Sequence, residues 1–303
     1  MQYIDGTPMR KLADQNNISP AEIHDRLVRE MDALPENTWI SEQYAERWSG
    51  RLNLDGKYVA VKGYDKKIPF IYGIDFLTHD IPVGLLAPSE NEEAFTKFFR
   101  LLKACRYPLH IVICDEASAI KPALARYFPN ARVQLCHVHY LENIRQRLLV
   151  RTLPKYQTFF YYLANAFRRE HHPAQRDAML RGLFESWGQR DFTLKLILID
   201  IMAKRDLLFA YNFNMDRCPH TNNLIEAFNS HLQGRLKSIK GFQSFHSAER
   251  WLNAWMLRRR TKPFTDCGKP FKHLNGKMSL QIVLKKDANF PSIPGIQAPK
   301  TER

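Results

Sequence analysis

The sequence contains little cysteine and no long apolar segment. Its five cysteines are odd in number and form no CxxC pair, which argues against a disulfide framework and against a zinc ribbon. No apolar run approaches the roughly 18 residues of a membrane helix, and the N-terminal region holds no signal-peptide core. No Ser-His-Asp or phosphate-loop motif is present either. These absences predict a soluble, cytoplasmic protein with no membrane partner.

Acidic residues are also in short supply. The chain has 31 Asp and Glu against 45 Lys and Arg, which gives a formal net charge of +14. An excess of this size usually indicates a polyanionic partner, and nucleic acid is the commonest. A membrane surface is the alternative, but no isolated basic amphipathic helix supports it. With 45% hydrophobic residues among its 303, the chain can bury a substantial core.

The remaining chain is organised around residues 111–143. Residues 111–114 (IVIC) are continuously apolar, which predicts a strand buried on both faces of a sheet. Asp115 follows directly, at the strand end where α/β folds place ligand-binding groups. Apolar residues at helical spacing then predict a helix over 120–127. The alternative is that Asp115 only caps this helix, because Asp is a favoured N-cap residue.

A second strand is predicted at 132–136, again with polar groups at its end. Cys136 and His139 would stand next to Asp115 at the edge of a site. Together with Cys218 and His220 they could instead form a structural zinc site, since thiolate and imidazole ligands suit zinc. Simple packing of these side chains is the third possibility.

Residues 1–33 are predicted to form a helix-turn-helix. A short first helix, the Asn16-Asn17 turn and a second helix capped by Ser19 give the spacing of that motif. A plain helical hairpin is the alternative. Residues 34–50 have no clear periodicity beyond a short polar helix, and we interpret them as a linker. The candidates for DNA contact on the second helix are His24, Arg26 and Arg29.

Three β-rich runs follow, at 51–62, 68–76 and 81–87, and their short spacing predicts an antiparallel meander. An amphipathic helix at 91–102 then leads to the strands already described. Three antiparallel strands, a helix, a strand, a helix and a strand is the element order of the ribonuclease H-like fold. We therefore expect a mixed α/β sheet of that kind, with residues 51–143 forming the first part of its core.

Asp55 lies in the first β-rich run and has two interpretations. Asp55-Gly56 is a strong hairpin signal, which would make the residue part of a tight turn. Strand-forming residues surround it, however, and another plausible turn comes at Gly63. A single long strand with Asp55 on its inner part is equally economical.

Residues 144–216 are almost wholly helical in pattern, and we predict an all-helical insertion. The core resumes over 217–262, where Glu226 lies beside the apolar stripe of a helix that Asn222 helps to open. Glu226 could also be only a capping partner for Asn223. Residues 263–303 are predicted to be a basic, proline-containing tail.

The last predicted helices are strongly basic and aromatic. Trp251 and Trp255 lie one helical turn apart. We expect them to pack in the core, and base stacking is the alternative. The residues of this region that we expect to contact DNA are Arg235, Lys237, Lys240, Arg258, Arg259 and Arg260.

Three blocks of the sequence resemble the Mutator-type DDE transposases of insertion sequences: LDGKYVAV, CDEASAIKPALARYFPNARVQLCHVHYLENI and TNNLIEAFNSHLQGRLK. The resemblance implies that Asp55, Asp115 and Glu226 are the catalytic carboxylates and hold two Mg²⁺ or Mn²⁺ ions. Converging carboxylates repel one another unless cations neutralise them, and such ions prefer oxygen ligands. Cys136 and His139 match the family's C-x2-H signature.

The resemblance further implies metal-dependent DNA strand cleavage and strand transfer at the ends of a mobile element. The expected partners are double-stranded DNA, as terminal inverted repeats and target, and further copies of the chain in a dimer or higher oligomer on the bacterial nucleoid. Two alternatives remain open. One is a transposase-derived DNA-binding protein without cleavage activity, and the other is a structure-directed nuclease of the same fold.

Overall fold

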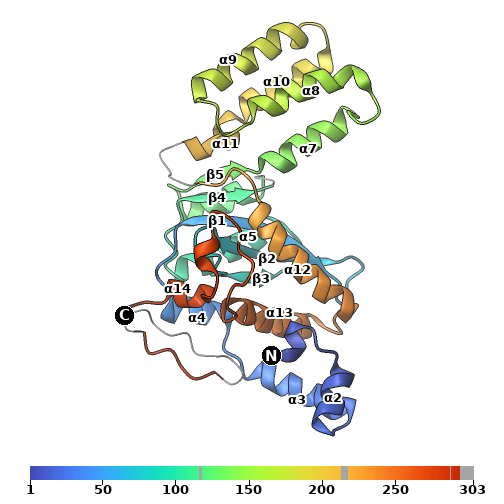
Figure 1. The fold of residues 1–303 in the computed structure, drawn as a ribbon, viewed down its shortest axis with the longest axis vertical. Helices are drawn as coiled ribbons and strands as arrows, with labels where there is room; N and C mark the ends of the chain where they lie inside the picture. The colour runs from blue at the N-terminus through green and yellow to red at the C-terminus, as the bar shows by residue number, and fades with distance from the viewer. Residues whose placement is uncertain (116–117, 213–217, 287, 294–303) are drawn as a thin grey trace. The chain divides into compact units, whose positions relative to one another are not determined.

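The computed structural model describes residues 1–115, 118–212, 218–286 and 288–293 (Figure 1). The chain divides into two compact units. Unit 1 comprises residues 1–110, 118–131 and 223 onward, and unit 2 comprises residues 111–117 and 132–222. None of the described helices is long and apolar enough to cross a membrane.

Three antiparallel strands form the sheet of unit 1: β1 (Arg51–Val59), β2 (Ile68–Asp75) and β3 (Gly84–Leu86). Every residue of β2 is buried, as expected for a central strand covered on both faces. The predicted meander is therefore confirmed. Asp55 faces Tyr72 across the β1–β2 ladder.

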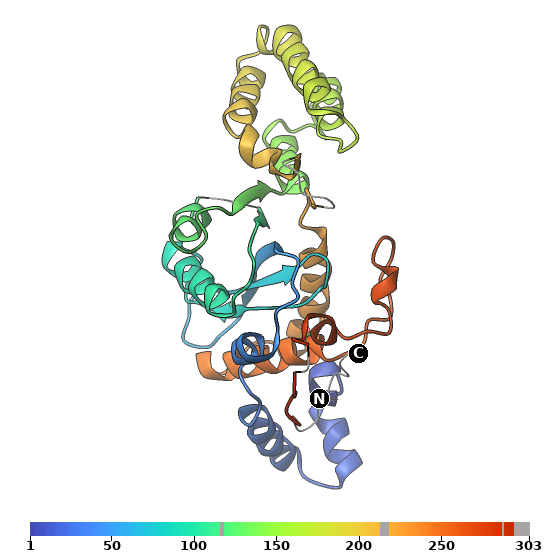
Figure 2. The ribbon, with the colours of Figure 1, turned by 90° about the vertical axis from the view of Figure 1, so that its left-hand side faces the viewer.

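Four helices flank these strands: α5 (Glu92–Ala104), α6 (Ile120–Tyr127), α12 (Asn223–Ile239) and α13 (Phe245–Arg260). Figure 2 shows the strands between α5 on one side and α12 on the other. Sequence signals explain the helix starts, since Asn91 accepts the Ala94 N–H at 3.0 Å and Ser244 forms a capping box with Ser247. Trp251 and Trp255 are 2% exposed, which confirms their predicted core role.

The N-terminal helices are α1 (Gln2–Asp5), α2 (Met9–Asn16) and α3 (Pro20–Asp32). Asn17 ends α2 in the left-handed conformation, and the Ser19 hydroxyl accepts the Glu22 N–H at 3.1 Å, so the predicted turn and cap are confirmed. Leu12 and Ala13 of α2 pack against Ile23 and Leu27 of α3.

The interval 34–50, predicted to be a linker, is part of the folded unit. It contains α4 (Asn37–Tyr44), whose Asn37, Ile40 and Ser41 side chains are buried. The predicted tail likewise contributes a folded segment, α14 (Ser279–Val283), and Leu284 pairs with Ala45 in an isolated antiparallel bridge. Residues 294–303 of the tail lie outside the described part of the chain.

A buried ion pair joins α4, α13 and α14. The Arg260 guanidinium donates two hydrogen bonds of 2.9 Å to Asp80 and also binds Asn37 Oδ1 and Ser41 Oγ. Both charged side chains are 0% exposed, and Asp80 also accepts from Ser279 at 2.9 Å. Every partner is hydrogen-bonded, which is what makes a buried charge tolerable. The prediction that Arg260 contacts DNA is therefore wrong, because its charge is enclosed and neutralised.

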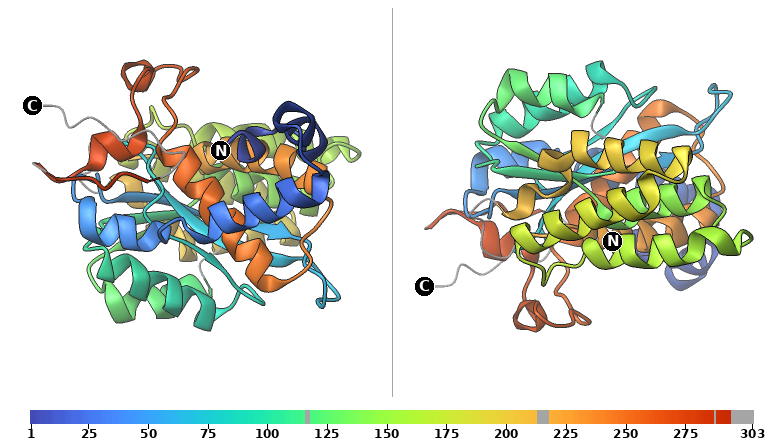
Figure 3. Two further views of the ribbon diagram at one scale, coloured as in Figure 1. Left: turned by 90° about the horizontal axis from the view of Figure 1, so that it is seen from below. Right: turned by 90° about the horizontal axis from the view of Figure 1, so that it is seen from above.

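Unit 2 contains two parallel strands, β4 (Ile111–Cys114) and β5 (Arg132–Leu135), as predicted. Its helices are α7 (His137–Arg147), α8 (Gln157–Ala166), α9 (Pro173–Leu183), α10 (Phe192–Ala203) and α11 (Arg205–Leu208). In Figure 3, α8, α9 and α10 lie side by side. The region predicted to be an all-helical insertion contains helices joined by turns, and no strand, wherever it is described, while residues 213–217 lie outside the described chain.

Candidate functional site

Asp55 lies within β1, with four residues of the strand on either side. The strand continues through Gly56 to Val59, so the tight-turn interpretation of Asp55-Gly56 is wrong. The Asp55 side chain is half-buried, and its Oδ1 accepts the Gly56 backbone N–H at 2.8 Å. This leaves the carboxylate fixed on the strand and still reachable from solvent.

An amide of α12 holds the other oxygen of Asp55. Asn229 Nδ2 donates to Asp55 Oδ2 at 2.5 Å. Glu226 precedes Asn229 by three residues on the same helix, and residues at this spacing are neighbours on the helix surface. Because Ile225 and Phe228 turn into the core, Glu226 and Asn229 lie together beside the buried stripe. Two of the three predicted carboxylates thus belong to one face of unit 1.

Tyr72 fixes the direction of this amide. Its hydroxyl donates to Asn229 Oδ1 at 2.8 Å, so the amide nitrogen must point to Asp55. Burial, followed by the charge of Asp55, raises the pKa of Tyr72 well above its usual value. The phenol therefore keeps its proton at any physiological pH and remains a donor.

The third predicted carboxylate, Asp115, belongs to unit 2 and directly follows β4. Its side chain is exposed. Helix α6 begins five residues later, with Ala119 at its N-cap and no side-chain cap. The interpretation of Asp115 as the cap of that helix is therefore wrong. Asn223 is the first residue of α12, and Glu226 lies in the first turn of that helix.

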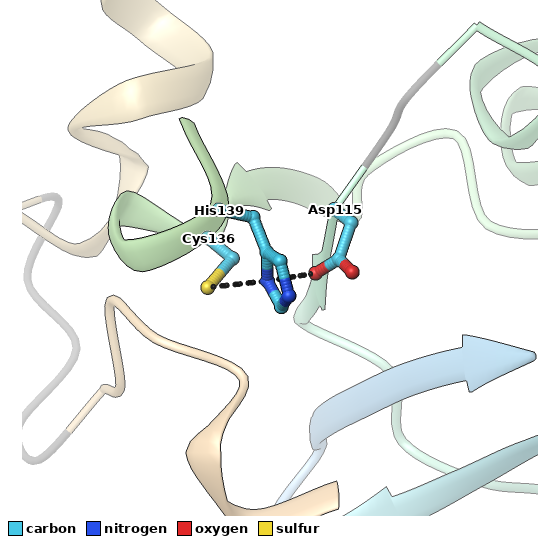
Figure 4. Close-up of side chains that lie close together, drawn as sticks. All are labelled: Asp115, Cys136 and His139. Atoms are coloured by element: carbon cyan, nitrogen blue, oxygen red, sulfur yellow. Dashed lines mark hydrogen bonds and ion pairs between the residues drawn. The ribbon is translucent and has the colours of Figure 1, made fainter. Parts of the chain in front are cut away.

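Within unit 2, the His139 ring lies between Asp115 and Cys136 (Figure 4). His139 Nδ1 lies 2.8 Å from Asp115 Oδ1 and 3.3 Å from Cys136 Sγ. An ionised carboxylate only accepts hydrogen bonds, so His139 Nδ1 is the donor of the hydrogen bond to Asp115. Asn222 donates its side-chain amide to Asp115 at 3.4 Å and its backbone N–H to Cys136 at 3.2 Å. The predicted accessory residues therefore surround Asp115.

The donor sets of the two settings differ in their chemistry. Asp55 and Glu226 offer only oxygen ligands, which suit Mg²⁺ or Mn²⁺. Around Asp115 the potential ligand atoms of Asp115, Cys136 and His139 lie within 4.8 Å of one another. Burial raises the pKa of the Cys136 thiol, which favours its neutral form over a metal-binding thiolate. Asp115 is therefore the one oxygen donor among the three groups of this setting.

The alternative zinc site of Cys136, His139, Cys218 and His220 is not assembled among the described residues. Cys218 and His220 do not join the cluster around Asp115. Instead, the His220 ring packs against His137 with 5.0 Å between ring centroids, and Cys218 is buried with its thiol 3.5 Å from the Pro219 carbonyl.

The residues predicted to contact DNA fall into two groups. His24, Arg26, Arg29, Lys237 and Lys240 are exposed. The arginines of α12 and α13 instead make internal contacts. Arg235 donates to the Tyr3 and Ile4 carbonyls, Arg258 pairs with Asp5, and Arg259 lies 4.6 Å from the Phe228 ring centre.

Asn229 and Tyr72 are the site residues that sequence analysis missed. The signal for Asn229 was its position three residues after Glu226, one helical turn away and next to the same core stripe. Tyr72 carried no such signal, because a tyrosine in a buried strand is usually only a core residue.

Comparison with known proteins identifies the class. The family described as "Transposase, Mutator family" matches residues 52–262, which covers all three predicted carboxylates. The chain is thus a transposase-family protein. Within that class it belongs to the Mutator family, as the resemblance of its three sequence blocks predicted.

Curated relatives agree. The chain is 25% identical over 267 residues to the transposase for insertion sequence element IS1201 of Lactobacillus helveticus, covering 82% of this chain and 69% of the relative. It is 26% identical over 229 residues to the transposase for insertion sequence element IS256 in transposon Tn4001 of Staphylococcus aureus. That match covers 73% of this chain and 57% of the relative. The same figures hold for the corresponding transposase of Enterococcus faecalis.

Proposed function

We propose that the chain is a DDE transposase, which cleaves DNA at the ends of a mobile element and joins the freed ends to target DNA. In this proposal Asp55, Asp115 and Glu226 form one metal-binding triad on a ribonuclease H-like core. The observation that carries it is the 2.5 Å hydrogen bond from Asn229 to Asp55, which ties the β1 carboxylate to the helix face that bears Glu226.

Chain connectivity supports including Asp115 in the triad. Asn222 is hydrogen-bonded to Asp115, and Glu226 follows Asn222 by only four residues. Four residues span at most about 14 Å when fully extended and less in a helix. This short covalent connection between Asn222 and Glu226 is the support for grouping the second carboxylate with the third in the proposal.

The residues of the chain have distinct tasks in this proposal. Asn229 and the Gly56 N–H hold the two oxygens of Asp55, while His139 and Asn222 hold Asp115. Two Mg²⁺ or Mn²⁺ ions bound by the triad would activate the attacking water or 3′-hydroxyl and stabilise the leaving oxygen. Pre-set carboxylates lower the cost of assembling such a site, because their rotamers are already fixed.

DNA recognition in the same proposal involves the N-terminal helices. Helix α3 exposes His24, Arg26 and Arg29 and buries Ile23 and Leu27, so one face is anchored and the other is available. This is the arrangement that a recognition helix of a helix-turn-helix requires. The expected DNA partners are the terminal inverted repeats and the target, and the expected active form is a dimer or higher oligomer.

The test is nicking of a labelled duplex that carries both ends of the element encoding the chain. Wild-type chain is expected to cleave in Mg²⁺ or Mn²⁺ and to be inactive in EDTA. Asp55→Asn, Asp115→Asn and Glu226→Gln keep side-chain size but lose the charge that binds the ions. Each is expected to reduce the cleavage rate by roughly 10³-fold or more.

Glu46→Gln is the matched control, since it removes one exposed carboxylate of unit 1 outside the proposed site. It is expected to cleave at the wild-type rate. DNA affinity in the absence of metal should be unchanged in all four variants. Cleavage at the wild-type rate by Asp55→Asn and Glu226→Gln would refute the assignment. Specific DNA binding without metal-dependent strand breakage by the wild-type chain would identify a DNA-binding protein instead.

A further inference from the structure

Unit 1 contains an open groove next to the C-terminal ends of β1 and α12, the elements that carry Asp55 and Glu226. One wall is the β1–β2 turn, residues 60–67, and the other is the α12–α13 connection, residues 239–243. The groove encloses about 420 Å³. We call it the lysine groove after the four lysines that line it: Lys62, Lys66, Lys67 and Lys240.

Backbone hydrogen bonds hold the two walls together. Phe242 donates its N–H to the Ala60 carbonyl at 2.9 Å, and Lys62 donates to the Phe242 carbonyl at 2.9 Å. Val61 and Phe242 form a parallel bridge between them. Gly241, with φ of 131°, lets the connection approach this closely. The groove is therefore preformed and does not depend on a bound ligand to bring its walls together.

The charge of the groove is strongly positive. Its lining includes four lysines and a single acidic residue, Asp65. All four lysines are exposed, and within the described parts of the chain no ion pair involves any of them. Tyr64 adds an aromatic ring that is 39% exposed. Four ammonium groups without carboxylate partners repel one another, so an anion bound among them would relieve that repulsion.

The arginines of the neighbouring helices provide the contrast. Arg250 pairs with Asp32, Arg258 with Asp5, and Arg260 with Asp80. Lysine suits the groove for a physical reason, since its ammonium is a mobile point charge that follows a phosphate backbone without imposing base specificity. The free cations of this region are therefore those best suited to a polyanion of variable sequence.

We propose that the lysine groove binds the phosphate backbone of the DNA duplex on which the chain acts, an inference that rests on the proposed function. Its distance from the cleavage site follows from helix geometry. Glu226 and Ile239 lie 13 residues apart on α12, which at 1.5 Å per residue is about 20 Å. At about 3.4 Å per base pair, the groove contacts phosphates roughly six base pairs from the bond that is cut.

The first experiment measures binding of a 30-base-pair duplex by fluorescence anisotropy over a range of salt concentrations, without divalent metal. In the groove variant, Lys62, Lys66, Lys67 and Lys240 are all replaced by alanine. Each lost phosphate contact lowers the slope of log affinity against log salt by about one, so the slope is expected to fall by about three to four. The dissociation constant at low salt is expected to rise at least about tenfold.

A control variant carries the same change in charge at exposed lysines elsewhere in unit 1. Its substitutions are Lys97→Ala, Lys121→Ala, Lys272→Ala and Lys286→Ala. It is expected to keep most of the wild-type salt slope. Circular dichroism and thermal melting would establish that both variants are folded. An equal slope in the groove and control variants would overturn the proposal, as would failure of the wild-type chain to bind the duplex.

The second experiment tests the location. Methylphosphonates, which lack the phosphate charge, are placed at successive positions along the duplex carrying the element end. Neutral positions about five to seven base pairs from the cleaved bond should weaken wild-type binding and have little effect on the groove variant. Sensitivity to these positions that is the same in both proteins would refute the assignment of the groove.

The outcomes separate this inference from the proposed chemistry. Weaker binding by the groove variant, with no metal-dependent cleavage by the wild-type chain, would keep the groove and reject the triad. The position of the groove would then be read from the methylphosphonate scan of the bound element end. Metal-dependent cleavage together with unchanged binding by the groove variant would keep the triad and reject the groove.

Discussion

The positive charges of unit 1 occur in two contrasting regions. Where α1, α3 and α4 meet α13, the arginines Arg250, Arg258 and Arg260 each face a carboxylate, and Arg260 is completely enclosed. In the lysine groove, four lysines lie together with a single acidic residue and remain exposed. A count of basic residues treats the two regions alike, although one stabilises the fold and only the other is available to a partner.

The difference follows the chemistry of the side chains. A planar guanidinium binds a carboxylate through two parallel hydrogen bonds, so arginine tolerates burial when its partner is well placed. Asp80 receives two such bonds from Arg260, each 2.9 Å long. An ammonium on a flexible stem is strongly hydrated and is better left in water. Three predictions test this contrast, beginning with the largest expected effect.

Arg260→Met should cause the greatest loss of stability. The substitution leaves the Asp80 carboxylate buried without its counter-charge, and breaking a buried pair in this way costs about 3–5 kcal/mol. Urea unfolding followed by circular dichroism measures the change. Adding Asp80→Asn to Arg260→Met should restore part of the loss, because the uncompensated charge disappears. Arg100→Met, at an exposed position of α5, is the control and should change the free energy of unfolding by less than about 0.5 kcal/mol.

The second prediction concerns His79, a buried residue that directly precedes Asp80 in the sequence. Burial, and then the charges of His273 and Arg259, lower the pKa of His79 to about 4 from its ordinary value of 6.5. Between these two values the unfolded chain binds a proton that the folded chain does not, so stability falls as the pH falls. One pKa unit corresponds to about 1.4 kcal/mol, which gives a loss of roughly 3 kcal/mol across this window.

This pH dependence is measured as the free energy of unfolding at pH 7.5 and at pH 5. His79→Asn, which tolerates the left-handed φ of 55° at this position, should reduce the difference between the two values. His24→Asn on exposed α3 is the control and should leave the difference unchanged. His137 in unit 2, with a pKa lowered to about 3 mainly by burial, acts in the same direction and should contribute a remaining dependence. A variant with the wild-type pH dependence would contradict the role of His79.

The smallest effect is expected for the partly exposed ion pair of Arg258 and Asp5. The Arg258 and Asp5 side chains are 24% and 30% exposed, and ion pairs near the surface contribute up to about 1 kcal/mol. Arg258→Ala should therefore lower stability by less than that amount. Lys66→Ala in the groove should be close to neutral. A larger loss from Lys66→Ala than from Arg258→Ala in the same unfolding assay would remove the distinction between the regions.

Much of the fold could be predicted from local patterns. The strand at 111–114 and the helix at 120–127 have the predicted bounds, because apolar spacing acts over a few residues. Interval 34–50 was misjudged for the opposite reason. Its polar residues Asn37 and Ser41 are buried by partners more than 200 residues away, and no local pattern reports such a partner.

The site shows the same limit. Asp55, Asp115 and Glu226 could be named from sequence blocks, and Cys136, His139 and Asn222 do surround Asp115. The roles of the basic residues could not be read in the same way. Arg258, Arg259 and Arg260 are consecutive, yet successive helical residues point about 100° apart, so one is enclosed while its neighbours reach the surface.

Tyr72 belongs to two systems at once. Its ring stacks on Phe70 and meets Trp255 edge-on inside unit 1, while its hydroxyl orients the amide that holds Asp55. Loss of that single oxygen would scarcely disturb the packing, yet it would free Asn229 to rotate away from the carboxylate. A side chain of the hydrophobic interior of unit 1 therefore sets the orientation of the amide that holds Asp55, so a substitution at Tyr72 can alter that carboxylate without a large loss of stability.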